Sequence, residues 1–373
     1  MQKKLIALAI AAVTSSAAFA QSNVTIYGTV DMGWLRTGGN NGGVTGTISK
    51  NALQSNAAQS SIGFKGVEDL GNGLKAIFDL QYRLNPDTAA APTLAGHQYV
   101  GLTGGFGTVL AGYLDGLRYG IYGKYNPFGN YSVGNFASMT TQYDRAANAI
   151  AYISPSFNGF TLILAHATNT QGDEGSLNGV HSLATRIADG GNNGDDRLYS
   201  ANLIYANGPL SVDLDYETTR AVGYSNSRLY VATGGASYDF GVVKIGGVYD
   251  VIKGQANSFI GGNTTFAAAA FGLAPDQEYD RRNWFLGATV PVGSATKLLV
   301  SYGQVKDKTL NNADASKWAI GARYAMSKRT ELYADYAHIK NDSNAGYTIH
   351  AMGNGSDIGG GVNGLDFGIK HTF

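Results

Sequence analysis

The sequence has no cysteine, little charge and no long apolar run after its first twenty residues, and each shortage excludes a class of protein. Because none of the 373 residues is cysteine, there is no disulfide framework and no thiolate metal site. Charged residues make up only 14% and are balanced, 27 basic against 27 acidic, so the sequence gives no reason to expect a nucleic-acid partner. The longest later run of small apolar residues, Phe266–Ala274, is far too short for a membrane-spanning helix.

Catalytic motifs are missing as well. The sequence contains no Gly-x-Ser-x-Gly elbow and no His-Glu-x-x-His motif, and its six histidines are scattered without the spacing of metal ligands. Two glycine-rich stretches, Gly71–Gly73 and Gly104–Gly107, look like phosphate-binding loops, but each forms a tight turn between strands with no helix after it. We therefore expect no enzyme, no cofactor and no metal site.

The first twenty residues have the pattern of an export signal. Two lysines precede the apolar run Leu5–Val13, and the segment ends with the small-x-small pattern of Ala18–Ala20. We expect cleavage between Ala20 and Gln21, which leaves 353 residues (373 minus 20) with 25 basic and 27 acidic side chains, a formal charge of −2. A membrane anchor is the weaker alternative, because this apolar run is much shorter than the roughly 20 residues that a hydrocarbon core requires.

The rest of the sequence alternates repeatedly between apolar and polar residues. In the stretch 210–217, Leu, Val, Leu and Tyr alternate with Ser, Asp, Asp and Glu, and the stretch 364–373 follows the same pattern. A period of two is typical of strands with one apolar face. We count sixteen strands, at 23–34, 60–68, 74–84, 96–103, 107–113, 147–154, 158–168, 198–206, 210–219, 228–239, 242–252, 282–291, 295–305, 316–326, 330–340 and 364–373.

The links between these strands alternate between tight turns and longer loops rich in Gly, Asn, Asp and Ser. Short periplasmic turns and long extracellular loops are the layout of bacterial outer-membrane barrels, whereas a soluble sandwich has no reason to sort its loops. Trp34, Trp284 and Trp318 fall on the apolar parity at one rim, as an interfacial aromatic girdle requires. We therefore predict an all-β fold, a sixteen-stranded antiparallel transmembrane β-barrel, which is closed so that lipid meets no unpaired backbone.

A barrel of this size is too wide for side chains to fill, so we expect a water-filled lumen that a loop narrows. The candidate loop is 114–146, the longest link, although the loops at 169–197 and 253–281 are nearly as long. Within and beside it are charged residues whose field would act on solutes in a narrow passage. The candidate constriction residues are Arg83 and Arg145 on the wall, and Asp115, Arg118 and Lys124 from the loop.

Six stretches, taken together, identify a family resemblance over the full length: Val24–Gly28, Ile62–Ala76, Tyr99–Val109, Ser154–Phe160, Ser327–Thr330 and Gly368–Phe373. They resemble the Gram-negative trimeric general porins of the β-proteobacterial type. The resemblance implies an outer-membrane general diffusion porin that passes ions and small hydrophilic solutes passively, with a constriction loop after the fifth strand. Its implied partners are two further copies in a homotrimer, outer-membrane lipid and lipopolysaccharide, and the barrel-insertion machinery, for which Phe373 would be the assembly signal.

The sequence leaves both the sign and the strength of the ion selectivity open. Gly96, Tyr113 and Ala151 stand where such porins tend to carry basic groups of the pore wall. The candidate constriction still has an excess of positive charge, which favours a weak anion preference; its charges are Arg83, Arg118, Lys124 and Arg145 against Asp115 and Asp144. Inward-facing acids could cancel or reverse this preference; they are Asp79, Asp213, Asp215 and Glu217. A barrel whose long loops serve mainly in adhesion or receptor binding is the alternative function.

Overall fold

The computed structural model describes residues 23–39, 49–88, 95–140, 145–168, 197–220, 228–255, 278–309, 312–349 and 361–373. The expected signal peptide, its cleavage site between Ala20 and Gln21, and Asp144 lie outside these ranges. Within these ranges, no helix combines the length and the apolar character that crossing a membrane requires.

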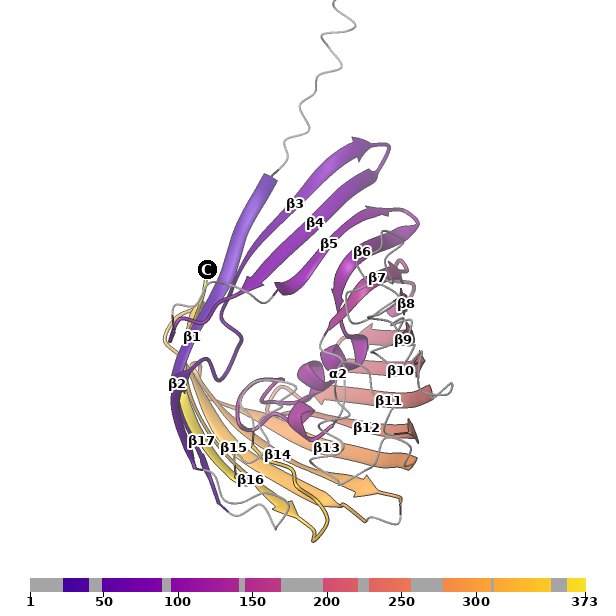
Figure 1. The fold of residues 1–373 in the computed structure, drawn as a ribbon. Coiled ribbons are helices and arrows are strands. Elements are labelled where there is room, and N and C mark those ends of the chain that lie inside the picture. The colour runs from indigo at the N-terminus through magenta and orange to yellow at the C-terminus, as the bar shows by residue number, and fades with distance from the viewer. Residues whose placement is uncertain are drawn as a thin grey trace, which may run out of the picture.

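Antiparallel strands form one sheet that closes on itself (Figure 1). The seventeen strands of the described residues are β1 (Asn23–Gly38), β2 (Lys50–Gln54), β3 (Ser61–Gly71), β4 (Leu74–Arg83), β5 (Ala95–Gly104), β6 (Gly107–Asp115), β7 (Arg145–Ile153), β8 (Phe160–Ala167), β9 (Arg197–Asn207), β10 (Leu210–Arg220), β11 (Arg228–Asp239), β12 (Lys244–Gln255), β13 (Glu278–Val292), β14 (Thr296–Asp307), β15 (Ala315–Ala325), β16 (Thr330–Asn341) and β17 (Asn363–Thr372). Because β2 and β3 pair with successive stretches of β1, they share one position around the barrel. The predicted sixteen-stranded antiparallel barrel is confirmed.

The barrel closes between its first and last strands. β1 pairs with β17 from Thr29 opposite Thr372 to Gly38 opposite Asn363. At the chain end, the backbone N–H of Phe373 donates to the carbonyl oxygen of Gly28 at 3.1 Å. In return, the backbone N–H of Gly28 donates to the carbonyl oxygen of Phe373 at 3.2 Å. A sheet closed in this way has no free edge, so its backbone groups are paired without water.

The alternation in the sequence becomes an inner and an outer face of the barrel. On β10, Leu214 and Tyr216 are 56% and 49% exposed on the outside, whereas Asp213, Asp215 and Glu217 are buried on the inside. The outer face also carries Trp34 and Trp318, which are exposed, as the sequence predicts. Apolar side chains outside and acids inside are the reverse of a soluble protein, and they suit a wall with lipid on one side and water on the other.

The link between β6 and β7 enters the barrel. Its described part contains helix α2 (Leu117–Tyr125) and the 3₁₀ helix η1 (Ala137–Met139), which lie inside the ring of strands in Figure 1. We call residues 116–140 the inner segment. α2 contacts β10, β11 and β12. The main hydrophobic cluster lies between the inner segment and the wall; its members include Tyr122, Tyr125, Phe128, Phe136, Val231, Val248 and Phe285.

Glycines on the inner face of the wall make room for the inner segment. A Cβ atom at Gly235 of β11 would collide with the ring of Tyr125 and with Ile121, and one at Gly287 of β13 would collide with Pro127. Comparable positions are Gly303 beside Phe136 and Gly364 beside Val133. The segment therefore packs along a track of four strands where the wall has no side chain in its way.

A second piece of chain departs from the wall between β2 and β3. The carboxylate of Asp31, which is fully buried on β1, accepts backbone N–H groups of Asn56, Ala57 and Ala58 at 2.6, 2.7 and 3.0 Å. Ser60 donates its hydroxyl to the carbonyl oxygen of Asp31 at 3.1 Å. These bonds replace the strand pairing that β1 would otherwise make at this height, so residues 55–60 form a fixed interruption of the wall.

Candidate pore constriction

The N-terminal half of the inner segment is held by a buried ion pair. The guanidinium of Arg118 on α2 pairs with the carboxylate of Asp250 on β12, and both side chains are buried. The same carboxylate accepts the hydroxyl of Tyr122 and, at 2.8 Å, the amide of Asn283. Burial lowers the pKa of the Arg118 guanidinium, but Asp250, Tyr122 and Glu217 together more than offset this and the net shift is upward, so Arg118 keeps its charge.

The C-terminal end of α2 meets a second acid of the wall. Lys124 Nζ lies 2.5 Å from Asp213 Oδ2 on β10, and the hydroxyl of Tyr125 donates to the same oxygen. Burial and the bond to Asp213 raise the pKa of Tyr125, so its hydroxyl remains a donor. The Lys124 side chain is 39% exposed, which leaves its charge accessible from the lumen.

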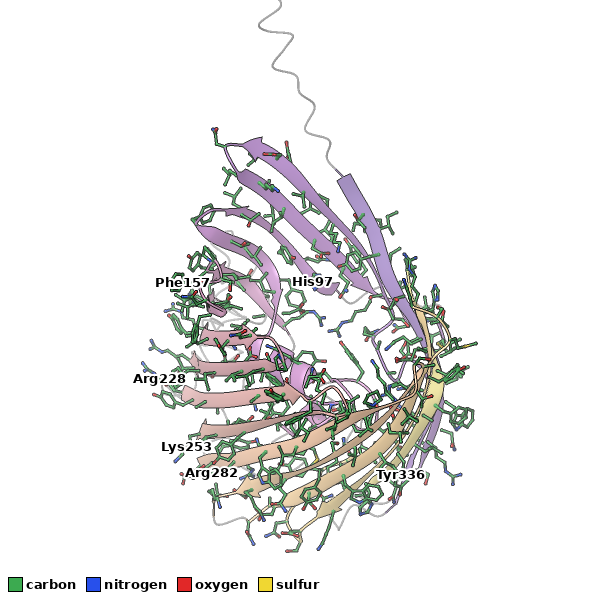
Figure 2. All side chains as sticks on the ribbon, turned by 180° about the vertical axis from the view of Figure 1, so that it is seen from behind. His97, Phe157, Arg228, Lys253, Arg282 and Tyr336 are labelled. Atoms are coloured by element: carbon green, nitrogen blue, oxygen red, sulfur yellow. The ribbon has the colours of Figure 1, made fainter. Side chains whose placement is uncertain are left out.

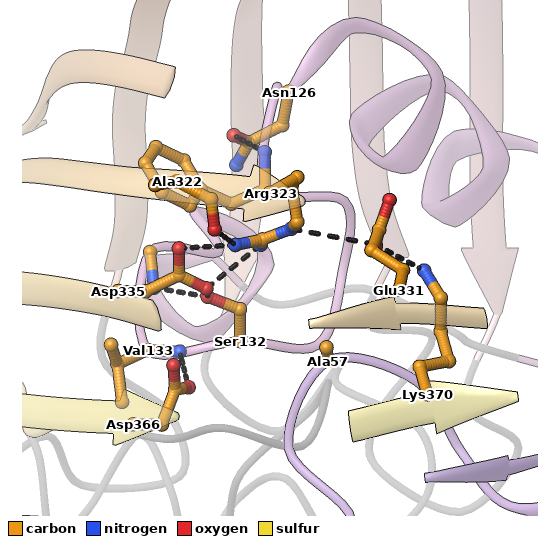
Figure 3. A network of polar contacts seen from close by, with 12 residues as sticks. Ala57, Asn126, Ser132, Val133, Ala322, Arg323, Glu331, Asp335, Asp366 and Lys370 are labelled. Atoms are coloured by element: carbon orange, nitrogen blue, oxygen red, sulfur yellow. Dashed lines mark hydrogen bonds and ion pairs between the residues drawn. The ribbon is translucent and has the colours of Figure 1, made fainter. Parts of the chain in front are cut away.

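The far end of the inner segment is bound to β15, β16 and β17 (Figure 3). Ser132 donates its hydroxyl to Asp335 at 2.5 Å, and the backbone N–H of Val133 donates to Asp366 at 2.8 Å. Arg323 holds Asp335 from the other side, with its two terminal nitrogens 2.5 and 2.8 Å from the carboxylate oxygens. Inward-facing acids on four strands therefore fix the inner segment, because Asp213 and Asp250 act in the same way at its other end.

A cavity of about 390 Å³ lies between the inner segment, residue Ala57 and the wall. Most of its charged lining is basic: Lys124, Lys244, Lys297, Arg323 and Lys370, against Glu331 as the one carboxylate among the described lining residues. Lys370 pairs with Glu331 at 2.9 Å. Lys244 and Lys297 are exposed to the lumen and have no ion-pair partner within the described ranges. We call this space the basic cavity.

The opposite wall carries a paired cluster of charges. Asp115, at the end of β6, lies 2.9 Å from the Nε of Arg145 and 2.9 Å from the Nδ1 of His97. His97 Nε2 is 3.3 Å from Asp79, which also accepts the hydroxyl of Tyr27 at 2.5 Å. Because its acids face partners within hydrogen-bond distance, this wall offers solutes less net charge than the basic cavity.

The five residues singled out from the sequence lie in four different environments. Lys124 lines the basic cavity, and Asp115 and Arg145 form the ion pair on the opposite wall. Arg118 is buried against Asp250, where it positions the inner segment. Arg83 ends β4 opposite Ser61 of β3 and does not line the basic cavity. Their roles in the pore stay predictions.

Sequence reasoning did not select the four wall cations of the basic cavity. Lys244, Lys297, Arg323 and Lys370 all fall on the inward parity of their strands, so the alternation did contain the signal. It could not show which inward charges face the inner segment. Within the described ranges, no group of three or more His, Asp or Glu side chains is placed to hold a metal ion.

Comparisons with known proteins agree with this geometry. The family model described as Gram-negative porin matches residues 7–344. Outer membrane porin protein 32 of Delftia acidovorans is 30% identical over 392 aligned residues that cover 100% of both chains. The structure titled anion-selective porin from Comamonas acidovorans has a TM-score of 0.73 and 27% identity, covering 95% of this chain and 100% of that one.

A more distant structure shows the same fold. The trimer form of OmpT, an outer membrane protein of Vibrio cholerae, superimposes with a TM-score of 0.64 at 12% identity and covers 94% of this chain and 99% of that one. Members of this class of barrel are typically trimeric. The family match spans most of the chain, and the closed barrel with its lined lumen accounts for passive diffusion without any catalytic group. The chain therefore belongs to the Gram-negative porin family, and it is a general diffusion porin of the outer membrane.

Proposed function

We propose that the pore is weakly anion-selective and that the basic cavity sets this preference. The observation that supports it is the lining of that cavity, five cations and one carboxylate. Lys124 and Arg323 are each partly neutralised, by Asp213 and Asp335. Lys244 and Lys297 remain as accessible charges, and a low-dielectric cleft focuses the field of such groups on passing ions. The likeness to a porin titled anion-selective supports the same sign.

The inner segment would act as the constriction. Its two ends are bound to different parts of the wall, to β10 and β12 through Asp213 and Asp250 and to β16 and β17 through Asp335 and Asp366. Within this arrangement, Lys124 presents charge to solutes and Arg118 positions the segment. Arg83, Asp115 and Arg145 would line the passage on the side of β4, β6 and β7. The basic cavity on one side and the ion-paired wall on the other would orient the water between them, which disfavours apolar solutes.

Reversal potentials in a KCl gradient test the proposal. The double variant Lys244→Gln and Lys297→Gln should lose the anion preference, because it removes the two exposed charges of the basic cavity that have no ion-pair partner within the described ranges. The matched control is Arg228→Gln with Arg282→Gln, which removes two charges from the outer face and should leave the reversal potential unchanged. The effect should fade toward 1 M salt, where the Debye length is about 3 Å.

A parent pore that prefers cations, or a lumen variant with the parent's reversal potential, would contradict the assignment. The variant Arg83→Ala tests the other wall. If it shifts the reversal potential as much as the lysine double variant does, the charge on β4, and not the basic cavity, sets the selectivity.

The remaining expectations concern biogenesis and partners. We propose that residues 1–20 are a signal peptide cut between Ala20 and Gln21, that the mature chain forms a homotrimer, and that Phe373 is read by the barrel-insertion machinery. Lipid and lipopolysaccharide of the outer membrane would surround the trimer. The exposed apolar side chains of the outer face support this placement.

A further inference from the structure

The inner wall beneath the start of α2 holds more buried acid than base. Asp215 and Glu217 are successive inward residues of β10, Asp250 lies on β12, and each of the three is at most 5% exposed. Arg118 pairs with Asp250, and it is also the one cation among the described residues that acts on Asp215 and Glu217. Three carboxylates and one guanidinium leave a formal charge of −2 (one minus three). Buried charges in proteins are paired or coordinate metal ions.

The two carboxylates of β10 have few direct partners. Glu217 accepts the backbone N–H of Arg118 at 3.4 Å, and Asp215 Oδ1 accepts the hydroxyl of Ser200 at 3.1 Å. Neither carboxylate makes an ion pair within the described ranges. A hydroxyl and a backbone N–H satisfy single oxygen atoms, but they carry no net charge that would offset two buried carboxylates.

The strand register places two further oxygen-bearing side chains beside Asp215. Asp215 lies directly opposite Asn202 on β9 and directly opposite Thr233 on β11, and all three are buried on the inner face. Directly opposed residues on one face have Cβ atoms about 5 Å apart. Asn202 Oδ1, Asp215 Oδ2 and Thr233 Oγ1 have no hydrogen-bond partner among the described residues. A bound water or ion accounts for such atoms, but only a cation would also offset the buried charge.

A second cavity inside the barrel, of about 280 Å³, reaches this place. Glu217 and Ser200 both line it, and so does His97, which points into the ring of strands in Figure 2. Its other carboxylates are Asp79 and Asp115, and no lysine or arginine is among its described lining residues. Asp79 and Asp115 have the partners given above, so Glu217 is the lining acid without an ion pair. The cavity gives a cation a route to Glu217 and, behind it, to Asp215.

We propose that a calcium ion binds beneath α2, with Asp215 and Glu217 as its charged ligands and Asn202 and Thr233 as neutral ones, directly or through water. All four side chains offer oxygen, and calcium takes about six to eight oxygen ligands in a flexible geometry that water can complete. Magnesium fits less well because it requires a near-ideal octahedron, whereas the strand register fixes where these oxygen atoms lie. The charge of calcium offsets the −2 of the buried group.

The bound ion would connect the wall with the inner segment. It links β9, β10 and β11 through their side chains, and Glu217 extends this link to the backbone of Arg118 at the start of α2. The site therefore concerns how firmly α2 is held, which goes beyond the ion selectivity proposed above.

Calcium binding by purified, folded porin in detergent tests the site, measured by equilibrium dialysis with radioactive calcium after bound ions are removed with EDTA. The parent should bind one calcium ion more per chain than the double variant Asp215→Asn and Glu217→Gln. Affinity at this site should fall at least about 100-fold, because losing even the outer partners of a metal ligand costs about 10–100-fold. The matched control, Glu68→Gln with Asp69→Asn, removes the same two types of carboxylate from the exposed end of β3 and should bind as the parent does.

Heat stability gives a second readout. Because calcium would bind the folded barrel, it should raise the unfolding temperature of the parent and of the control, and leave that of the double variant unchanged. In EDTA the double variant should be at least as stable as the parent, because it keeps the shapes of both side chains and no longer buries their charge.

Each other outcome overturns the proposal. A parent that binds no calcium would show that protons neutralise the two acids. Equal stoichiometry in the parent and the double variant would place the ion elsewhere, and equal loss in the control would show a general effect of surface charge. Magnesium that displaces calcium at equal concentration would contradict the choice of ion. Reversal potentials of the lysine variants are measured separately, so a failure here leaves the selectivity proposal standing.

Discussion

Buried and exposed charged residues on the inner face of this porin have different roles. Asp213, Asp250, Asp335 and Asp366 are buried and bind the inner segment, whereas Lys244 and Lys297 are exposed to the lumen. Carboxylates accept several bonds at once, so one acid can hold a backbone N–H, a hydroxyl and a guanidinium. Lysine keeps its charge at the end of a flexible stem, in water. Net charge per strand therefore says little about the field that a solute meets.

Arg118→Gln should release one end of the inner segment. The change leaves Asp250 buried without its cation, and breaking such a pair costs about 3–5 kcal/mol. We expect larger or noisier single-channel currents than in the parent, measured in planar bilayers. Lys124→Gln is the control, because its partly exposed pair should affect selectivity and leave the current amplitude close to that of the parent. Parental currents in Arg118→Gln would show that Asp250 does not hold the segment.

At the scale of elements, glycines in the wall leave the space that the inner segment occupies. Gly235 faces inward beneath Tyr125, whereas its neighbour Gly234 faces outward, where an added Cβ would meet Leu214 at an ordinary 3.6 Å. The two glycines thus lie side by side on β11 in opposite environments.

Gly235→Ala should push α2 away from β11, while Gly234→Ala should have no effect on the pore. The displaced helix would change the size limit of the channel, which liposome swelling with sugars of increasing size measures. Both variants should fold, because the ladder of β11 needs no special backbone angle at either position. Identical swelling rates for the two variants would mean that the segment adapts without moving.

The sequence predicted the strands better than the pieces inside the barrel. The range 228–239 coincides with β11, because its alternation runs to both ends. The strand expected at 282–291 begins earlier, at Glu278, since polar residues at its outer end resemble a loop. The five-residue β2 was missed, and so was α2, which contains Gly120 and Gly123 and is a poor helix former on its own. Contacts with Asp213 and Asp250 stabilise it, and those contacts exist only in the closed barrel.

On the scale of the whole molecule, the chain end is part of the closure of the barrel. The backbone of Phe373 exchanges two hydrogen bonds with Gly28, and its ring packs across that glycine. The side chain itself is 42% exposed on the outer face. It is thus accessible to a receptor until neighbouring lipid or protein covers it.

Phe373→Ala should lower the amount of porin in the outer membrane without changing channels that do assemble. The backbone bonds to Gly28 need no side chain, so a closed barrel remains possible. Unheated outer membranes on SDS gels should show less of a large, heat-sensitive trimer, and single channels should keep the parental conductance. Equal trimer bands in variant and parent would refute a role for Phe373 in assembly, and a monomer alone in both would refute the trimer.

The division of each strand into a lipid face and a water face also bears on delivery. Because apolar residues occupy only every second position in the strands, a window within a strand is about half polar, and the mean hydropathy of the whole sequence is −0.11. The machinery of the inner membrane retains segments of roughly 20 continuous apolar residues. A strand that is fully apolar on one side only is passed over by that machinery, and it becomes membrane-seeking when pairing gathers its apolar side chains on one surface. The period of two therefore keeps the strands from being retained in the inner membrane, and their apolar surface forms only when they pair at the outer membrane.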